Sequence, residues 1–183
     1  MKILLCAFVL AASMAFAESE GAKVLKIGLA TDDIKMWVHL PDAENGYYRG
    51  TRFDWSGIIA RVEYKDHSFY APWRFPHDPV GHDFVTGPAE EFGMDNPSGW
   101  DEVGPGGSFV KVGVGLLRKG DEEEYAFHGQ YEIIRAGEWD VEYGKDWVEF
   151  RQDFVGERGW AYKYKKRIEL DEAGFSIAHW MAN

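Results

Sequence analysis

Residues 147–181 read WVEFRQDFVGERGWAYKYKKRIELDEAGFSIAHWM and contain three runs of apolar and aromatic residues, at 147–154, 160–170 and 175–181. In the last run the apolar positions alternate, which is the period of a β-strand. Each pair of runs is separated by a short break that contains glycine, and such breaks are typical of tight turns. This stretch therefore predicts a meander of antiparallel β-hairpins.

The same period of two recurs through most of the chain before this stretch. Strand-like runs span 36–40, 58–64, 109–116, 131–135 and 139–143. Residues 109–116 are expected to form one strand, with Val110, Val112, Val114 and Leu116 on one face. Few apolar patterns have the spacing of a helix. The predicted fold class is all-β, an antiparallel β-sandwich.

The amino end has the pattern of a cleavable signal peptide. Lys2 precedes an apolar stretch at 3–12, and Ala15-Phe16-Ala17 forms a small-x-small cleavage site. The apolar stretch is too short to span a bilayer. We expect cleavage after Ala17, a secreted or periplasmic protein without a membrane anchor, and one β-sandwich domain over 18–183. Cys6 is the only cysteine and leaves with the signal, so no disulfide and no thiolate metal site is predicted.

Composition narrows the class of ligand. The formal net charge of −11 repels phosphate backbones, so no nucleic-acid partner is expected. Aromatic residues make up 16% of the chain. Stacking of sugars is one use of this surplus, and an aromatic β core is the other. Serine-hydrolase, nucleotide-binding and zincin motifs are absent from the sequence.

An irregular interval at 73–107 interrupts the strand pattern. Proline and glycine recur throughout it, which excludes regular strands. Long irregular segments in a compact β protein are usually functional or disordered, and this one is rich in aromatic and charged residues. We expect ordered loops that line a site.

Three segments in or beside this interval concentrate polar and aromatic side chains: 50–57 (GTRFDWSG), 77–83 (HDPVGHD) and 86–93 (TGPAEEFG). Glu90 and Glu91 can supply a general acid or base. Because adjacent residues of an extended chain point to opposite faces, only one is expected to enter a given site. Alternatively, one glutamate pairs with Arg52 and the other is solvated.

Two histidines and an arginine are further candidates. His77 and His82, each followed by aspartate, are read as a metal half-site, an acid–base pair or hydrogen-bonding groups at a pocket rim. No third histidine or cysteine lies near them in sequence, so neither metal nor cofactor is predicted. The planar fork of Arg52 suits vicinal hydroxyls or a carboxylate, and its alternative role is to pair with Asp54. Trp73, like Trp55 and Trp100, is either a stacking platform or a packing residue.

The strings 47–59 (YYRGTRFDWSGII) and 87–93 (GPAEEFG) resemble a bacterial branch of the aldose 1-epimerase, or galactose mutarotase-like, family. The resemblance implies a supersandwich fold and interconversion of sugar anomers. A glutamate takes the proton of the anomeric hydroxyl while a histidine protonates the ring oxygen. The candidate substrate-binding residues are Arg52, Asp54, Trp73, His77, His82, Glu90 and Glu91.

In that family the acid histidine follows the strand that corresponds here to 177–183, and the base glutamate lies near the far carboxyl terminus. Neither position is present, and the last strand would leave an open apolar edge. We therefore expect the N-terminal portion of a larger sandwich, inactive by itself, from an isomerase that binds a small carbohydrate as a monomer. Alternatives are a non-catalytic carbohydrate-binding module and a purely structural exported β-domain.

Overall fold

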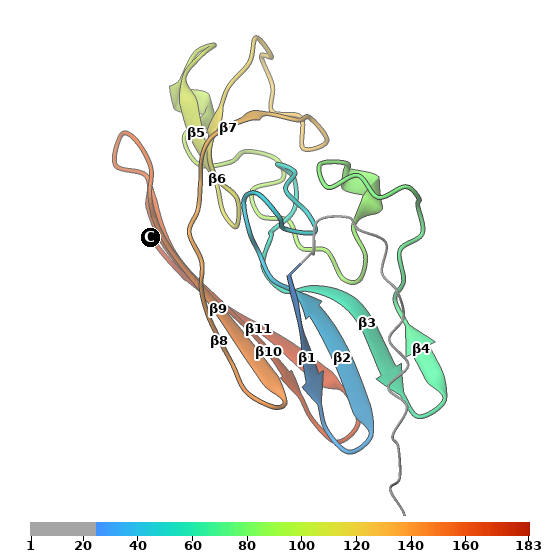
Figure 1. The fold of residues 1–183 in the computed structure, drawn as a ribbon. Coiled ribbons are helices and arrows are strands. Elements are labelled where there is room, and N and C mark those ends of the chain that lie inside the picture. Colours follow the sequence, from blue (N-terminus) through green and yellow to red (C-terminus); the bar gives the residue numbers. More distant parts are fainter. Residues whose placement is uncertain (1–24) are drawn as a thin grey trace, which may run out of the picture.

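The computed structural model describes residues 25–183, which form three antiparallel sheets and two short 3-10 helices, η1 (His82–Phe84) and η2 (Trp100–Glu102) (Figure 1). The all-β prediction is confirmed at this level. The signal-peptide prediction falls on residues outside this described part. Within 25–183, no helix is long and apolar enough to cross a membrane.

Two four-stranded sheets lie face to face. The strands of the first are β1 (Lys26–Ala30), β2 (Ile34–His39), β3 (Ile58–Tyr64) and β4 (His67–Phe69), in that order. The second has the order β11 (Phe175–Ala182), β10 (Ala161–Leu170), β9 (Trp147–Val155), β8 (Asp140–Tyr143). Their shared core contains Leu29, Ile34, Met36, Val38, Ile59, Val62, Val148, Phe150, Ile168 and Leu170. Burial of this apolar surface is the main force that holds the two sheets together.

The second sheet matches the meander predicted for 147–181. β9, β10 and β11 pair antiparallel in sequence, with Lys163 opposite Ala182 at one end and Leu170 opposite Phe175 at the other. Every even-numbered residue of β10 from 162 to 170 is buried. β10 therefore presents one complete face to the interior, as the period of two requires.

The third sheet corrects one sequence prediction. Residues 109–116 do not form a single strand: β5 (Ser108–Lys111) and β6 (Gly115–Arg118) form a hairpin, and β7 (Glu132–Ala136) completes the sheet. The reversal is possible because Gly113 and Gly115 have φ angles of 80° and 143°. Val110 and Leu116 consequently pair across two strands and pack against β9 and β10.

A bulge corrects a second prediction. The alternation expected over 58–64 breaks where the pairing of β2 with β3 shifts between Trp37 and Val38. Ile59 and Val62 consequently share the core between the sheets, whereas Ile58 packs with Trp55 and Trp100 in a neighbouring aromatic cluster.

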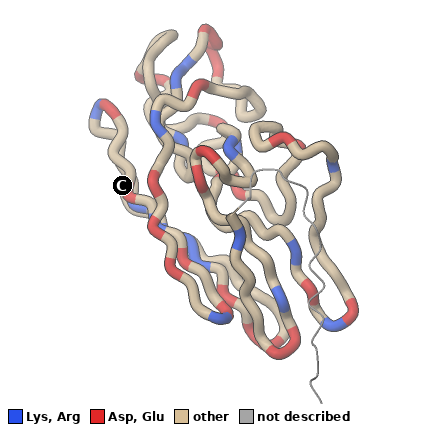
Figure 2. Tube along the Cα trace, in the orientation of Figure 1, with Lys and Arg blue, Asp and Glu red and all other residues tan. Residues whose placement is uncertain are grey.

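The interval 73–107 contains η1, η2 and one isolated β-bridge, and otherwise consists of loops. The expectation of an irregular segment is confirmed. The short strands β1 and β4 and both 3-10 helices are additions that the sequence patterns did not predict. In Figure 1 the loops gather at the end of the sandwich opposite the β1–β2 and β10–β11 turns. Those turns carry the acidic residues Asp32, Asp33, Asp171 and Glu172 (Figure 2).

Candidate functional site

Backbone hydrogen bonds join two of the three candidate segments. The amide of Asp54 donates to the carbonyl of Glu90 at 2.9 Å, and the amide of Trp55 donates to the carbonyl of Gly113 at 3.2 Å. The indole of Trp55 is buried and donates to the carbonyl of Gly50 at 2.7 Å. The 50–57 and 86–93 segments are thus fixed to one another and to the β5–β6 hairpin.

Arg52 lines a small pocket. Its guanidinium carbon is 4.6 Å from the ring centroids of both Phe53 and Phe127, so the planar cation is held by two aromatic rings. A pocket of about 270 Å³ adjoins it, hereafter the Arg52 pocket, which is lined by Arg52, Gly81, His82, Asp83, Phe84 and His128. Two of the expected site residues, Arg52 and His82, therefore meet here.

Glu91 holds Arg52 in place. Nε of Arg52 donates to Oε2 of Glu91 at 2.9 Å, and Nζ of Lys111 lies 3.5 Å from the other carboxylate oxygen. Burial lowers the pKa of Lys111, and the charge of Glu91 opposes that shift. The alternative prediction that Arg52 forms its ion pair with Asp54 is wrong, because its carboxylate partner is Glu91. With Nε engaged by Glu91, no other described residue binds the terminal nitrogens of Arg52, which remain available to a ligand.

His82 faces the pocket from η1. Its Nδ1 lies 2.9 Å from the hydroxyl of Tyr48, which in turn accepts hydrogen bonds from the amides of Arg52 and Phe53. Burial lowers the pKa of His82. A neutral imidazole is therefore favoured at neutral pH, with Nδ1 engaged by the Tyr48 hydroxyl and Nε2 buried.

Two expected site residues lie outside this pocket. Nε2 of His77 is 2.7 Å from the carbonyl of Tyr47, and its ring stacks on the ring of Tyr47 at 4.2 Å. Trp73 is largely exposed, and it reaches the pocket only through Arg74, whose guanidinium lies over its ring. Of the seven candidate substrate-binding residues, Arg52 and His82 line the Arg52 pocket, whereas His77 and Trp73 do not.

The other two, Asp54 and Glu90, belong to a second cluster between the loops and the second sheet. This cluster, hereafter the Asp54 network, consists of Asp54, Ser56, Glu90, Tyr164, Lys166 and His179. Oδ2 of Asp54 accepts hydrogen bonds from Tyr164 at 2.8 Å and from the Ser56 hydroxyl at 2.7 Å. Nζ of Lys166 lies 3.6 Å from the same oxygen.

Glu90 closes the network into a ring. One of its carboxylate oxygens forms an ion pair with Lys166, and the other lies 2.7 Å from Nε2 of His179. Nδ1 of His179 lies 3.1 Å from the Tyr164 hydroxyl. Glu90 is paired and half-buried, so the alternative prediction that it is solvated is wrong. The prediction that Glu90 and Glu91 point to different sides is confirmed, because Glu91 pairs with Arg52 instead.

Burial dominates the electrostatics of this network. It raises the pKa of Asp54, although Lys166, Ser56 and Tyr164 favour the carboxylate. Burial and the neighbouring Asp54 raise the pKa of Tyr164, so the phenol stays protonated and donates its hydrogen bond. The network therefore fixes the loop segments onto β10 and β11. Asp54 and Lys166 are almost completely removed from water, whereas Glu90 and His179 are partly exposed.

Sequence reasoning missed Lys166 and Lys111. Lys166 lies on the same buried face of β10 as Tyr162, Tyr164 and Ile168. A strict period of two would therefore have predicted a buried lysine, which requires an anionic partner.

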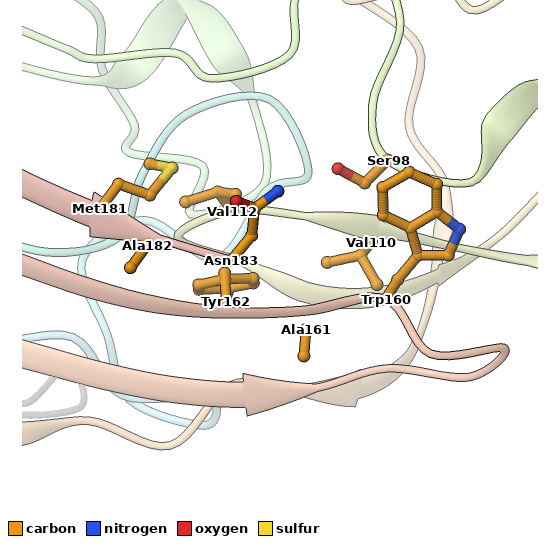
Figure 3. Close-up of a pocket in the computed structure, with 9 residues that line it drawn as sticks. All are labelled: Ser98, Val110, Val112, Trp160, Ala161, Tyr162, Met181, Ala182 and Asn183. Atoms are coloured by element: carbon orange, nitrogen blue, oxygen red, sulfur yellow. The ribbon is translucent and has the colours of Figure 1, made fainter.

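A second pocket, of about 260 Å³, lies beside the end of β11 (Figure 3). Its lining is mostly apolar and consists of Ser98, Val110, Val112, Trp160, Ala161, Tyr162, Met181, Ala182 and Asn183. None of the sequence-predicted site residues belongs to it. Unlike this pocket, the Arg52 pocket has charged and imidazole side chains in its lining.

In the described part of the chain, no three histidine, cysteine, aspartate or glutamate side chains are grouped so as to hold a metal ion. No family model matches the sequence, and comparison with curated proteins and with solved structures finds no significant match. The site geometry is therefore the basis for inferring function.

Proposed function

We propose that this chain binds a carbohydrate in the Arg52 pocket, as part of a galactose mutarotase-like β-sandwich. The observation that carries the proposal is the fixation of Arg52. Glu91 holds Nε at 2.9 Å, and the rings of Phe53 and Phe127 hold the guanidinium plane at 4.6 Å. An arginine fixed in this way can donate two parallel hydrogen bonds with little loss of side-chain entropy.

The remaining lining complements a sugar. His128 offers imidazole nitrogens, Asp83 offers carboxylate oxygens, and Phe84 adds an apolar ring. Sugar-binding sites combine such polar groups, which bond to hydroxyls, with rings that contact the apolar CH face. The resemblance of 47–59 to aldose 1-epimerase-like proteins supports the same ligand class, because that segment contains Arg52.

Binding is better supported than catalysis. Acid–base opening of a sugar ring needs an acid and a base that both reach the substrate. In the Asp54 network, Glu90 and His179 bond to one another at 2.7 Å, and the second nitrogen of His179 faces Tyr164. That pair is occupied internally, so anomer interconversion stays a prediction that rests on the resemblance.

The test is calorimetric titration of the protein with glucose, galactose and mannose. We expect saturable binding of at least one sugar and a loss of roughly tenfold or more in affinity for Arg52→Ala, equivalent to about 1.4 kcal/mol. Arg52→Lys keeps the charge but loses the planar fork, so it should bind almost as weakly. Arg61→Ala is the matched control, because Arg61 is an exposed residue of β3.

Circular dichroism checks that each variant is folded, and polarimetry on the same samples measures mutarotation separately. Absence of saturable binding by every sugar in folded wild-type protein would contradict the proposal. Equal affinities of the wild type and Arg52→Ala would place the sugar elsewhere.

A further inference from the structure

Four large aromatic side chains are exposed within one short segment that leads from β4 toward η1. The exposed fractions are 48% for Phe69, 40% for Tyr70, 64% for Trp73 and 77% for Phe75. Isolated exposed apolar residues are ordinary, but a run of four aromatics marks an interaction surface. None of the four lines the Arg52 pocket.

Arg74 connects this surface to the pocket. Its guanidinium carbon lies 4.7 Å from the Trp73 ring centroid, and its Nη1 lies 3.3 Å from Oδ2 of Asp83. The same guanidinium lies 5.9 Å from the ring centroid of Phe84. Asp83 and Phe84 both line the Arg52 pocket, so Trp73, Arg74 and the pocket rim form a continuous surface.

We propose that Trp73 and Arg74 form a second sugar subsite, so that the protein binds an oligosaccharide with one unit in the Arg52 pocket and the next on Trp73. This inference rests on the proposed function and specifies its ligand as a chain of sugars. The two sites are joined by direct side-chain contacts through Asp83 and Phe84, which places a neighbouring sugar unit next to the indole.

The chemistry of the pair suits one sugar unit. The indole provides a large flat surface for the CH face of a pyranose, and it has only two side-chain torsions to fix on binding. Arg74 lies on part of the Trp73 ring, which restricts the orientation of the indole before any ligand arrives. Arg74 keeps further N–H donors beyond the one that faces Asp83, and these can reach hydroxyls of the same sugar.

The test compares monosaccharides with tetrasaccharides by calorimetry: glucose with cellotetraose, galactose with β-1,4-galactotetraose, and mannose with β-1,4-mannotetraose. We expect the wild type to bind one tetrasaccharide roughly tenfold more tightly than its monosaccharide, a gain of about 1.4 kcal/mol. Trp73→Ala should reduce the tetrasaccharide affinity to the monosaccharide level and leave the monosaccharide affinity unchanged. Trp180→Ala is the matched control, because Trp180 is a 52% exposed tryptophan on β11.

The outcomes separate the two proposals. Suppose that a monosaccharide binds and that Arg52→Ala abolishes this binding. If the tetrasaccharide then binds no more tightly than the monosaccharide, or Trp73→Ala leaves the tetrasaccharide affinity unchanged, the second subsite is refuted and the proposed function stands. If no sugar binds, both are refuted. Partition of the protein into phosphatidylcholine vesicles that is lost in Trp73→Ala, with unchanged tetrasaccharide affinity, would assign the aromatic segment to a lipid surface and overturn the inference.

Discussion

The carboxylates of Glu90 and Glu91, adjacent in sequence, bind different cations on opposite sides of one loop. Glu90 pairs with Lys166 of β10, and Glu91 pairs with Arg52 beside the pocket. The two side chains diverge, as is expected of adjacent residues in an extended chain. The loop thereby links the Asp54 network, which fixes it to the second sheet, to the residue that would hold the sugar.

The first prediction concerns the control of Arg52 by Glu91. Glu91→Gln removes the negative charge between Arg52 and Lys111, so the guanidinium is held less firmly and Lys111 remains buried without a counter-ion. We expect roughly tenfold weaker sugar binding, and a loss of about 3 kcal/mol in the free energy of unfolding from breaking a buried pair. Calorimetry and urea unfolding measure the two effects.

Glu132→Gln is the matched control for this change. Glu132 pairs with Arg118 on the exposed surface of the third sheet, so its replacement should alter neither sugar affinity nor stability appreciably. If Glu91→Gln behaved like Glu132→Gln in both measurements, the proposed role of Glu91 would be wrong.

The second prediction tests the Asp54 network. Lys166→Met keeps the length of the side chain but leaves Asp54 buried without its cation. We expect the free energy of unfolding to fall by about 3–5 kcal/mol. The double variant Asp54→Asn, Lys166→Met removes both charges and should recover part of this loss. Urea unfolding of the two single variants and of the double variant measures the coupling energy between the two charges. Additive losses in the double variant would show that the two charges do not stabilise each other.

Much of the second sheet could be predicted because its strands are long runs separated by glycine-containing turns, and β10 follows a strict period of two. The site was harder to predict from the sequence, because its residues come from segments that are far apart along the chain. Arg52, His82 and Glu91 were singled out by residue type, yet nothing in the sequence decided whether Arg52 pairs with Asp54 or with Glu91. That choice depends on the hydrogen bond between the amide of Asp54 and the carbonyl of Glu90, a tertiary contact.

The error at 109–116 has a different cause. Val110, Val112, Val114 and Leu116 fit one amphipathic strand, and the period alone cannot distinguish this from a hairpin. The signal that was overlooked is the pair of glycines at 113 and 115, which lie between the valines and adopt φ angles that other residues avoid.

The third prediction follows from that hairpin. Gly113 has a φ of 80°, and a Cβ at this position would lie 2.6 Å from Oδ1 of Asp54. Gly113→Ala should therefore lower the free energy of unfolding by about 1–3 kcal/mol, through backbone strain and displacement of a buried carboxylate. Gly104→Ala, where a Cβ would meet nothing within 4 Å, is the control measured beside it by thermal unfolding. Equal melting temperatures for the two variants would contradict the assigned geometry.

The fourth prediction is a pH dependence of stability caused by His39. Its ring is buried and stacks on Tyr47 at 4.0 Å, and burial, with smaller contributions from Lys26 and His77, lowers the pKa of His39 from 6.5 to about 4. Between these two values the unfolded chain binds a proton that the folded chain does not. The free energy of unfolding should therefore fall as the pH is lowered from 6.5 to 4, by about 3 kcal/mol from this residue, and the loss should level off below pH 4.

His39→Phe keeps a ring that can stack on Tyr47 but cannot bind a proton, so it isolates this contribution from the carboxylates that also titrate in acid. Urea unfolding of the wild type and the variant at intervals from pH 4 to pH 7 should give a shallower decline for His39→Phe, with the two curves separating as the pH falls below 6.5. Parallel curves over this range would mean that the folded state accepts the proton on His39 as readily as the unfolded state. The stacked, buried placement of that ring would then be incorrect.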